Sequence, residues 1–295
     1  MIGRTVTFVS PVVLSLKNNQ MVVVFKDRPE EKHTIPVEDL GVVIIDNPQV
    51  SITVPLLNAF ASNNVVVVFC NEKGVPTSIL WNLDTNYSQC SVLNNQIEAD
   101  GRQKRKWWRK TVQSKIQNQM GLLQKLGKDA DVLKPFVSDS KNKDLANKEG
   151  IAARLYFQEL FGPDFIRDRT QPGINAMLNY GYTILRTACI KSLLGSGVFP
   201  AIGLFHHHRA NAFPLADDIM EPYRPYVDEI VFMEWANGES ELNRQAKSKL
   251  VNVLYGDTEF EKVTRPLHIG LQMTAASLAG CYKGEKGEIS YPLIR

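Results

Sequence analysis

The pattern of hydrophobic and polar positions changes near residue 85. Before that point, short runs rich in β-branched residues are separated by turn residues, a pattern typical of strands and their connections. The predicted strands run from Thr5 to Val9, Val12 to Leu16, Met21 to Phe25, Val42 to Ile45 and Val65 to Phe69. Asn18-Asn19, between two alternating runs, predicts a hairpin turn, and Pro55 to Ser62 predicts a short helix between strands.

After residue 85, apolar residues recur at helical spacing over long stretches. The predicted helices run from Gln96 to Leu126, Asp144 to Phe161, Gly173 to Leu194 and Leu215 to Met233. At 295 residues the chain exceeds the usual size of a single core, so two domains are expected. We therefore predict an α+β protein with a small N-terminal β-rich domain, residues 1–84, and a larger all-α domain, residues 85–295.

The composition indicates a soluble protein of a reducing compartment. The four cysteines lie far apart in the sequence, and no apolar stretch is long enough to span a bilayer. Met1 leads into a predicted strand rather than into a signal peptide. We expect a cytoplasmic protein with no membrane partner. The formal net charge of +3 is too small to indicate a nucleic-acid partner by itself, so only the distribution of charge can do so.

The densest candidate chemistry lies between Gly203 and Asp228, where three consecutive histidines, His206, His207 and His208, precede a run of carboxylates. Imidazole nitrogen and carboxylate oxygen together suit Mg²⁺ or Mn²⁺. A structural zinc site is disfavoured because it would normally add cysteines at short spacing. The alternative is that the histidines form a polar turn and the acidic residues a solvated helix face.

The acidic run is expected to lie on a helix that starts at Pro214, since proline suits the first helical position. Asp217 and Asp218 precede Glu221 by four and three residues, so the carboxylates would share one face. Pro222 removes a helical hydrogen bond and should kink the helix immediately after Glu221.

A basic block is the second candidate site. Its charged members are Arg102, Lys104, Arg105, Lys106, Arg109 and Lys110, which surround Trp107 and Trp108. Positive charge interleaved with aromatic residues suits contact with a DNA backbone. The alternative is an ordinary solvated face, because Trp108, Val112 and Ile116 have helical spacing; we assign Trp108 to the core and the basic side chains to DNA contact. Tyr182 is likewise assigned to the core rather than to stacking on a DNA end.

At this point a resemblance becomes specific. Six stretches carry it in order: 108–119, 147–156, 178–182, 203–206, 211–213 and 215–225. Together they resemble the CRISPR-associated spacer-acquisition integrase, the larger of the two core adaptation proteins, and most closely the version found with type II systems. Ordered blocks that cover nearly the whole chain are far more specific than a single motif.

The resemblance implies a metal site and its ligands. By position in the matching motifs, the catalytic ligands of a divalent metal are Glu149, His206 and Glu221, and Asp218 is an auxiliary acidic residue. His206 is preferred over His207 and His208 because of its spacing from Gly203 and to Glu221.

The implied function is a metal-dependent DNA integrase and endonuclease of CRISPR adaptation. A 3′-hydroxyl of a short prespacer duplex would attack a phosphodiester at the boundary of a CRISPR repeat. The implied partners are prespacer DNA, repeat DNA, a second copy of the chain and the small adaptation protein, with two dimers bridged by a dimer of that protein. The N-terminal domain would serve dimerisation and docking. The alternatives are a noncatalytic DNA-end-binding scaffold and a structure-specific repair nuclease.

Overall fold

The computed structural model describes residues 4–72, 76–80, 88–138, 145–206, 209 and 211–295. The chain forms two compact units, residues 1–85 and 86–295, and each is described by itself. The predicted domain boundary between residues 84 and 85 lies outside the described residues.

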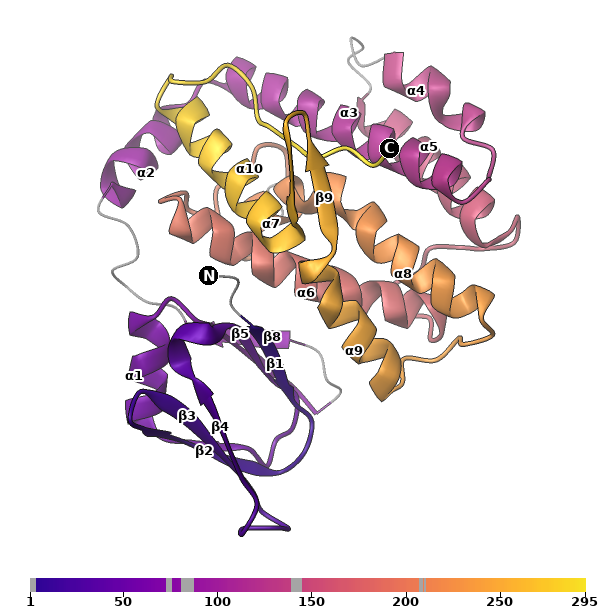
Figure 1. Ribbon diagram of the computed structural model, residues 1–295. Helices are drawn as coiled ribbons and strands as arrows, with labels where there is room; N and C mark the ends of the chain where they lie inside the picture. The colour runs from indigo at the N-terminus through magenta and orange to yellow at the C-terminus, as the bar shows by residue number, and fades with distance from the viewer. Residues whose placement is uncertain (1–3, 73–75, 81–87, 139–144, 207–208, 210) are drawn as a thin grey trace. The chain divides into compact units, whose positions relative to one another are not determined.

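The smaller unit contains two four-stranded sheets and one helix (Figure 1). One sheet has the strand order β1-β5-β7-β8 and the other β4-β3-β2-β6. The elements are β1 (Arg4–Phe8), β2 (Val12–Lys17), β3 (Gln20–Phe25), β4 (Lys32–Pro36), β5 (Leu40–Ile45), β6 (Ser51–Ile52), α1 (Val54–Ser62), β7 (Val66–Cys70) and β8 (Pro76–Leu80), with a 3₁₀ turn at Val37–Asp39. The five predicted strands and the short helix are therefore confirmed to within two residues.

The predicted hairpin turn is also confirmed. β2 pairs antiparallel with β3, and Asn18 and Asn19 between them have φ values of 50° and 56°. Asparagine tolerates this left-handed region better than most residues, and two such residues in succession form the turn whose twist matches that of the strands. β1, β5 and β7 pair in parallel, and the apolar faces of both sheets contribute to one core with Leu56 and Phe60 of α1.

The larger unit is mainly helical. Its helices are α2 (Gln89–Glu98), α3 (Gly101–Lys125), α4 (Lys134–Ser138), α5 (Leu145–Phe161), α6 (Ile174–Gly195), α7 (Pro214–Met220), α8 (Arg224–Ala236), α9 (Arg244–Asn252) and α10 (Leu267–Tyr282). It also contains 3₁₀ turns at Asp131–Leu133, Glu221–Tyr223 and Val253–Tyr255, and the antiparallel hairpin of β9 (Asp257–Phe260) and β10 (Val263–Pro266). The α+β class is confirmed, and this hairpin is an addition to the predicted all-α domain.

Two predicted helices are divided in the structure. The stretch from Gln96 to Leu126 contains a break, because the side chain of Asp100 accepts a hydrogen bond from the backbone N–H of Arg102 and caps α3. The stretch from Leu215 to Met233 is divided by the 3₁₀ turn that starts at Glu221, as the missing N–H of Pro222 predicts. None of the helices in the described part of the chain combines the length and apolar character needed to cross a bilayer.

α6 is the central helix of the larger unit, and α7, α8, α9 and α10 all pack against it (Figure 1). The contact between α6 and α8 is close at Gly181, where an added Cβ would lie 2.4 Å from Cγ1 of Val227. Both residues are buried, so the side chain of Val227 has no room to move away from an added Cβ.

We predict that Gly181→Ala lowers the free energy of unfolding by about 1–3 kcal/mol, the usual cost of overpacking a core. Gly195→Ala, on the same helix, is the matched control, because an added Cβ there meets no atom within 4 Å among the described residues. Urea denaturation of both variants measures the difference. Equal stability of the two variants would contradict the close packing of α6 on α8.

Candidate functional site

The larger unit contains a buried cluster of charged side chains at the crossing of α3 and α5. Nζ of Lys115 on α3 lies 2.6 Å from Oε1 of Glu149 on α5 and 2.7 Å from Oε2 of Glu221. Nε of Arg224 lies 2.9 Å from Oε1 of Glu221. The side chains of Lys115, Glu149 and Glu221 are 10%, 16% and 8% exposed, so solvent screens their charges little. Two of the three predicted metal ligands are therefore within reach of one cation.

Lys115 was not singled out in the sequence, although a signal was present. It lies seven residues after Trp108 and three after Val112, on the face of α3 that is buried. A lysine on a buried helix face requires a partner for its charge, because an unpaired buried ammonium is very unfavourable. Burial alone would lower the pKa of Lys115, but the charges of Glu221 and Glu149 outweigh it, and the pKa is raised.

Glu221 begins the turn that divides α7 from α8. Asn118 of α3 donates a hydrogen bond of 2.7 Å to the backbone oxygen of Pro222, which fixes the turn against α3. Burial opposes the charge of Glu221, but Arg224 and Lys115 together hold the pKa of its carboxyl well below the usual value. Oε2 of Glu221 is buried and makes no hydrogen bond of good geometry with the described residues; its contact with Lys115 is an ion pair.

His206 is positioned by Asp218 of α7, which is fully buried. The carboxylate of Asp218 accepts hydrogen bonds from the backbone N–H groups of Leu204, Phe205 and His206, and its Oδ1 lies 2.6 Å from Nδ1 of His206. The hydrogen bond to Asp218 raises the pKa of His206, and burial partly offsets this. With Nδ1 bound in this way, Nε2 is the nitrogen that remains for another ligand.

The turn that carries His206 requires a glycine. An added Cβ at Gly203 would lie 2.2 Å from the backbone oxygen of His206. The ring of Trp108 stacks on Phe205 at 4.8 Å and contacts the edge of His206, so Trp108 belongs to the core, as predicted. His207 and His208 lie outside the described residues.

The predicted acidic face of α7 serves three separate purposes in the structure. Asp217 accepts a hydrogen bond of 2.6 Å from Nε of Arg186 and one of 2.6 Å from Nδ2 of Asn211. Asp218 instead binds the backbone of the turn that carries His206. Only Glu221 reaches Lys115. Because all three carboxylates have partners, the alternative of a solvated acidic face is wrong.

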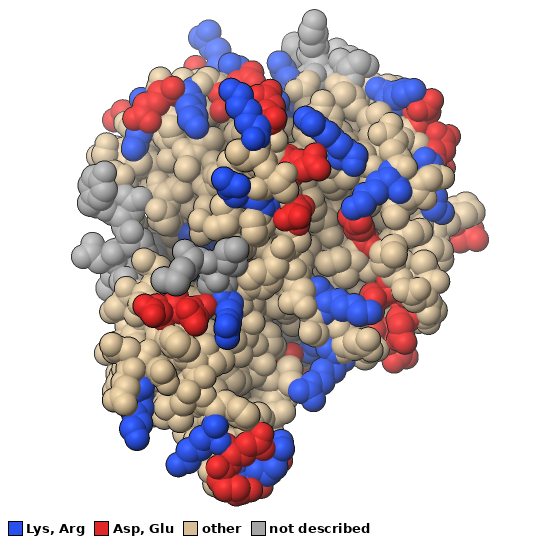
Figure 2. Space-filling view, viewed as in Figure 1, with Lys and Arg blue, Asp and Glu red and all other residues tan. Residues whose placement is uncertain are grey.

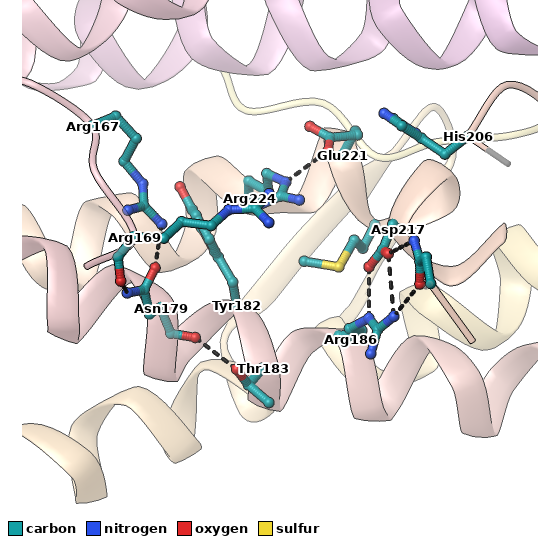
Figure 3. A pocket seen from close by; sticks show the side chains of 12 residues that line it. Arg167, Arg169, Asn179, Tyr182, Thr183, Arg186, His206, Asp217, Glu221 and Arg224 are labelled. Carbon is teal, nitrogen blue, oxygen red and sulfur yellow. Dashed lines mark hydrogen bonds and ion pairs between the residues drawn. The ribbon is translucent and has the colours of Figure 1, made fainter. Parts of the chain in front are cut away.

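A cleft of about 590 Å³ opens beside this cluster (Figure 3). His206, Asp217 and Glu221 line one side, and Arg167, Arg169 and Tyr182 line the other, with Arg224 extending between them (Figure 3). Arg167, Arg169, Arg186 and Arg224 line the cleft, whereas Arg154 and Arg209 are exposed and are not among its lining residues. The cleft is therefore a cationic surface next to two carboxylates.

Glu149 lies on α5 where the sequence contains several small residues. Ala152 is fully buried, whereas Gly150 is exposed and an added Cβ would meet nothing within 4 Å among the described residues. Ile151 is 44% exposed and therefore lies outside the buried face of α5. Ala152 is thus the small residue that faces the core, and Gly150 is not needed for close packing.

Comparison with known proteins connects this geometry to a family. A family model described as CRISPR associated protein Cas1 matches residues 8–265. The chain belongs to the Cas1 family. It is 35% identical over 253 residues to the CRISPR-associated endonuclease Cas1 of Neisseria meningitidis serogroup C (strain 8013), with 84% of this chain and 82% of the relative covered.

Solved structures show the same fold. A casposase bound to integration product has a TM-score of 0.82 and 18% identity, and the alignment covers 97% of this chain and 92% of the casposase. A chain of a Cas6-RT-Cas1–Cas2 complex has a TM-score of 0.73 and 21% identity, with 97% of this chain and 35% of the other covered.

The basic block of this Cas1 family member lies on the first turns of α3. Trp107 and Trp108 are both buried, whereas Arg102, Arg105, Lys106 and Arg109 are exposed and Lys104 is half-buried. Nε of Arg102 lies 3.7 Å from Oδ2 of Asp100, and Nζ of Lys106 donates a hydrogen bond to the backbone oxygen of Gly287. In the view of Figure 2, positive and negative side chains alternate, with no broad area of one sign on that face.

Asp228 is a further buried carboxylate, and it lines a smaller cavity that shares several residues with the cleft. Asp228 accepts hydrogen bonds from the hydroxyls of Tyr156, at 2.8 Å, and Tyr182. Tyr182 is buried, as predicted for a core residue, and the guanidinium of Arg224 stacks over its ring at 4.5 Å. Burial raises the pKa of Asp228 from 3.8 to about 6, although the two tyrosine hydrogen bonds oppose the shift.

The raised pKa of Asp228 predicts a pH-dependent stability. Folding favours the neutral carboxyl, so this contribution is fully present below pH 3.8 and is lost as the pH rises through about 6. The difference amounts to about 3 kcal/mol in the free energy of unfolding. Denaturation curves of the wild type and Asp228→Asn between pH 4 and 7.5 should diverge by this amount. Parallel curves would show that the carboxyl is already ionised at pH 4.

Proposed function

We propose that this protein is a metal-dependent DNA integrase and endonuclease of CRISPR adaptation. The observation that supports this function best is the meeting of Glu149 and Glu221 at one cation beside an arginine-lined cleft. Membership of the Cas1 family and the endonuclease name of the Neisseria meningitidis relative support it further. The reaction class is phosphodiester transfer, in which the cleft holds the DNA backbone next to the carboxylates.

The residues fit a divalent cation by their chemistry. Glu149 and Glu221 supply oxygens within reach of one positive charge, and Oε2 of Glu221 is buried without a hydrogen bond from the described residues. His206 supplies Nε2, and Asp218 holds its ring. Among the described residues, no three such side chains are already grouped to hold a metal ion, and the Lys115 ammonium lies between the two carboxylates. Mg²⁺ or Mn²⁺ held by Glu149, His206 and Glu221 would stabilise the charge that develops on the attacked phosphate.

The bond exchange requires no covalent enzyme intermediate. A 3′-oxygen of the prespacer forms a bond to the phosphorus at the repeat boundary, and the bond from that phosphorus to the 3′-oxygen of the repeat strand breaks. The proton of the attacking hydroxyl ends on the leaving oxygen. Arg167, Arg169 and Arg224 place positive charge along the cleft, where they neutralise phosphates and favour the transition state electrostatically. Water in place of the hydroxyl gives endonuclease cleavage.

The proposed assembly follows from the family. The DNA partners are the prespacer duplex and the CRISPR repeat, and the casposase whose fold matches this chain was solved with integration product. The protein partners are a second copy of this chain and the small adaptation protein, with two dimers bridged by a dimer of the small protein. A chain with this fold occurs in a Cas6-RT-Cas1–Cas2 complex. The N-terminal domain is proposed to serve dimerisation and docking.

Two other functions make different predictions. A noncatalytic DNA-end-binding scaffold would bind DNA ends without any metal-dependent strand transfer. A structure-specific repair nuclease would act equally on any branched duplex. An integration assay on a repeat-containing plasmid, with the small adaptation protein present, separates both from an integrase.

We predict that Glu149→Ala, His206→Ala and Glu221→Ala each abolish strand transfer in Mn²⁺, because each removes a proposed metal ligand, and that each leaves DNA binding measured without metal largely intact. His207→Ala is the matched control, since adjacent side chains project in different directions, and it should retain most activity. The measurement is the rate of strand transfer into a labelled repeat. An active His206→Ala with an inactive His207→Ala would move the proposed ligand by one residue.

DNA contact by the basic block predicts a change in salt dependence. Replacing Arg105 and Arg109 with Ala should weaken DNA binding and reduce the slope of log affinity against log salt by about two, roughly one per lost phosphate contact. Lys262→Ala with Arg265→Ala on the β9–β10 hairpin is the control, because it removes the same charge from another exposed site. Identical slopes for the two double variants would show that the block is an ordinary solvated face.

A further inference from the structure

Lys115 occupies the position between the two carboxylates that the proposed function assigns to a metal. Its ammonium lies 2.6 Å from Glu149 and 2.7 Å from Glu221, which are contact distances for an ion pair. A divalent cation held by both carboxylates would need the oxygens that Lys115 now contacts, so the two positive charges exclude each other. Either the Lys115 ammonium or a divalent cation can therefore occupy the position between the two carboxylates, but not both at once.

The burial of the cluster makes this competition important. Without a counter-charge, Glu149 and Glu221 would repel each other in a poorly solvated site, and Arg224 contacts only Glu221. Lys115 is the residue that contacts both carboxylates, and Arg224 supplies the second positive charge. We propose that Lys115 is a built-in counter-ion that holds the two carboxylates together until a divalent cation displaces it, and that it thereby weakens metal binding in the absence of DNA.

The surroundings of Lys115 indicate how DNA would affect metal binding. A smaller cavity of about 210 Å³ adjoins the cleft, and Lys115 lines it together with Arg167, Arg169, Arg224 and Asp228. Three guanidinium groups make this cavity unfavourable for a further cation unless an anion enters with it. A DNA phosphate in the cleft is such an anion, so metal and DNA should each increase the affinity for the other.

This inference rests on the proposed metal site, and it predicts the behaviour of Lys115→Met. Methionine keeps much of the apolar stem volume and removes the charge. Mn²⁺ titration of the full chain without DNA, followed by electron paramagnetic resonance or calorimetry, should give a dissociation constant at least about tenfold lower for Lys115→Met than for the wild type. Lys115→Arg keeps the charge and should bind Mn²⁺ no more tightly than the wild type.

Thermal unfolding gives a second readout that does not depend on activity. In EDTA, Lys115→Met should have a lower Tm than the wild type, and Mn²⁺ should raise its Tm by more. The double variant Lys115→Met with Glu221→Gln removes a positive and a negative charge together and should recover part of the lost Tm. It also provides a folded protein for comparison if the single variant is too unstable to purify.

The outcomes separate this inference from the proposed function. Equal Mn²⁺ affinity in the wild type and Lys115→Met overturns the counter-ion role while the metal site stands. Failure of both proteins to bind Mn²⁺, with or without a DNA duplex, overturns the metal site and the counter-ion role together. Tighter binding by Lys115→Met, with a weaker effect of added DNA on its Mn²⁺ affinity, supports the inference.

Discussion

The contact between the Lys115 ammonium and the carboxylates of Glu149 and Glu221 is the interaction on which the rest of the site depends. The carboxylates of Glu149 and Glu221, 72 positions apart in the sequence and little exposed to solvent, cannot approach one another without positive charge between them. This requirement explains why α3 carries a lysine on its buried face. It also explains why the turn at Glu221 is attached to α3 through Asn118 rather than left to solvent.

The two sides of the cleft are held in place in different ways. Asp218 is fully buried and holds three backbone N–H groups, so the backbone before His206 has little freedom. The opposite side of the cleft carries arginines that are themselves held in place: Arg167 donates hydrogen bonds to Asn175 and Asn179, and Arg224 pairs with Glu221 and lies over the ring of Tyr182. Both sides of the cleft are therefore fixed by contacts within the larger unit.

The sequence predicted most elements that have a strong local period. The alternating strands of the smaller unit and the long helices α5 and α6 depend on their own pattern, and the break after Glu221 follows from the covalent structure of Pro222. β4 was missed because Lys32–Pro36 is an edge strand with mostly polar residues, and the β9–β10 hairpin was missed because each strand has only four residues. Asp100 was a recognisable cap that divided a predicted helix.

The candidate site was harder to predict for a physical reason. A motif can identify Glu149, His206 and Glu221 one at a time, but their partners are determined by the crossing of helices. Lys115 and Glu149 are 34 residues apart, and Tyr156 and Asp228 are 72 residues apart. The sequence does place two polar residues, Lys115 and Asn118, on the face of α3 that is buried. Such residues require polar partners when buried, but the sequence does not identify those partners.

The hydrogen bonds of Asn118 also bear on the order in which the larger unit folds. The same amide that binds the backbone oxygen of Pro222 also binds that of Pro292, and its oxygen accepts the N–H of Ile294. Leu293 in turn pairs with Glu259 of β9. The contact with Pro222 spans 104 positions, whereas those with Pro292 and Ile294 span 174 and 176 positions. Contacts between residues far apart in the sequence form late in folding because a long loop must close first. One side chain of α3 therefore joins three distant segments, and the turn that carries Glu221 can be attached to α3 before residues 292–294 take their places beside it.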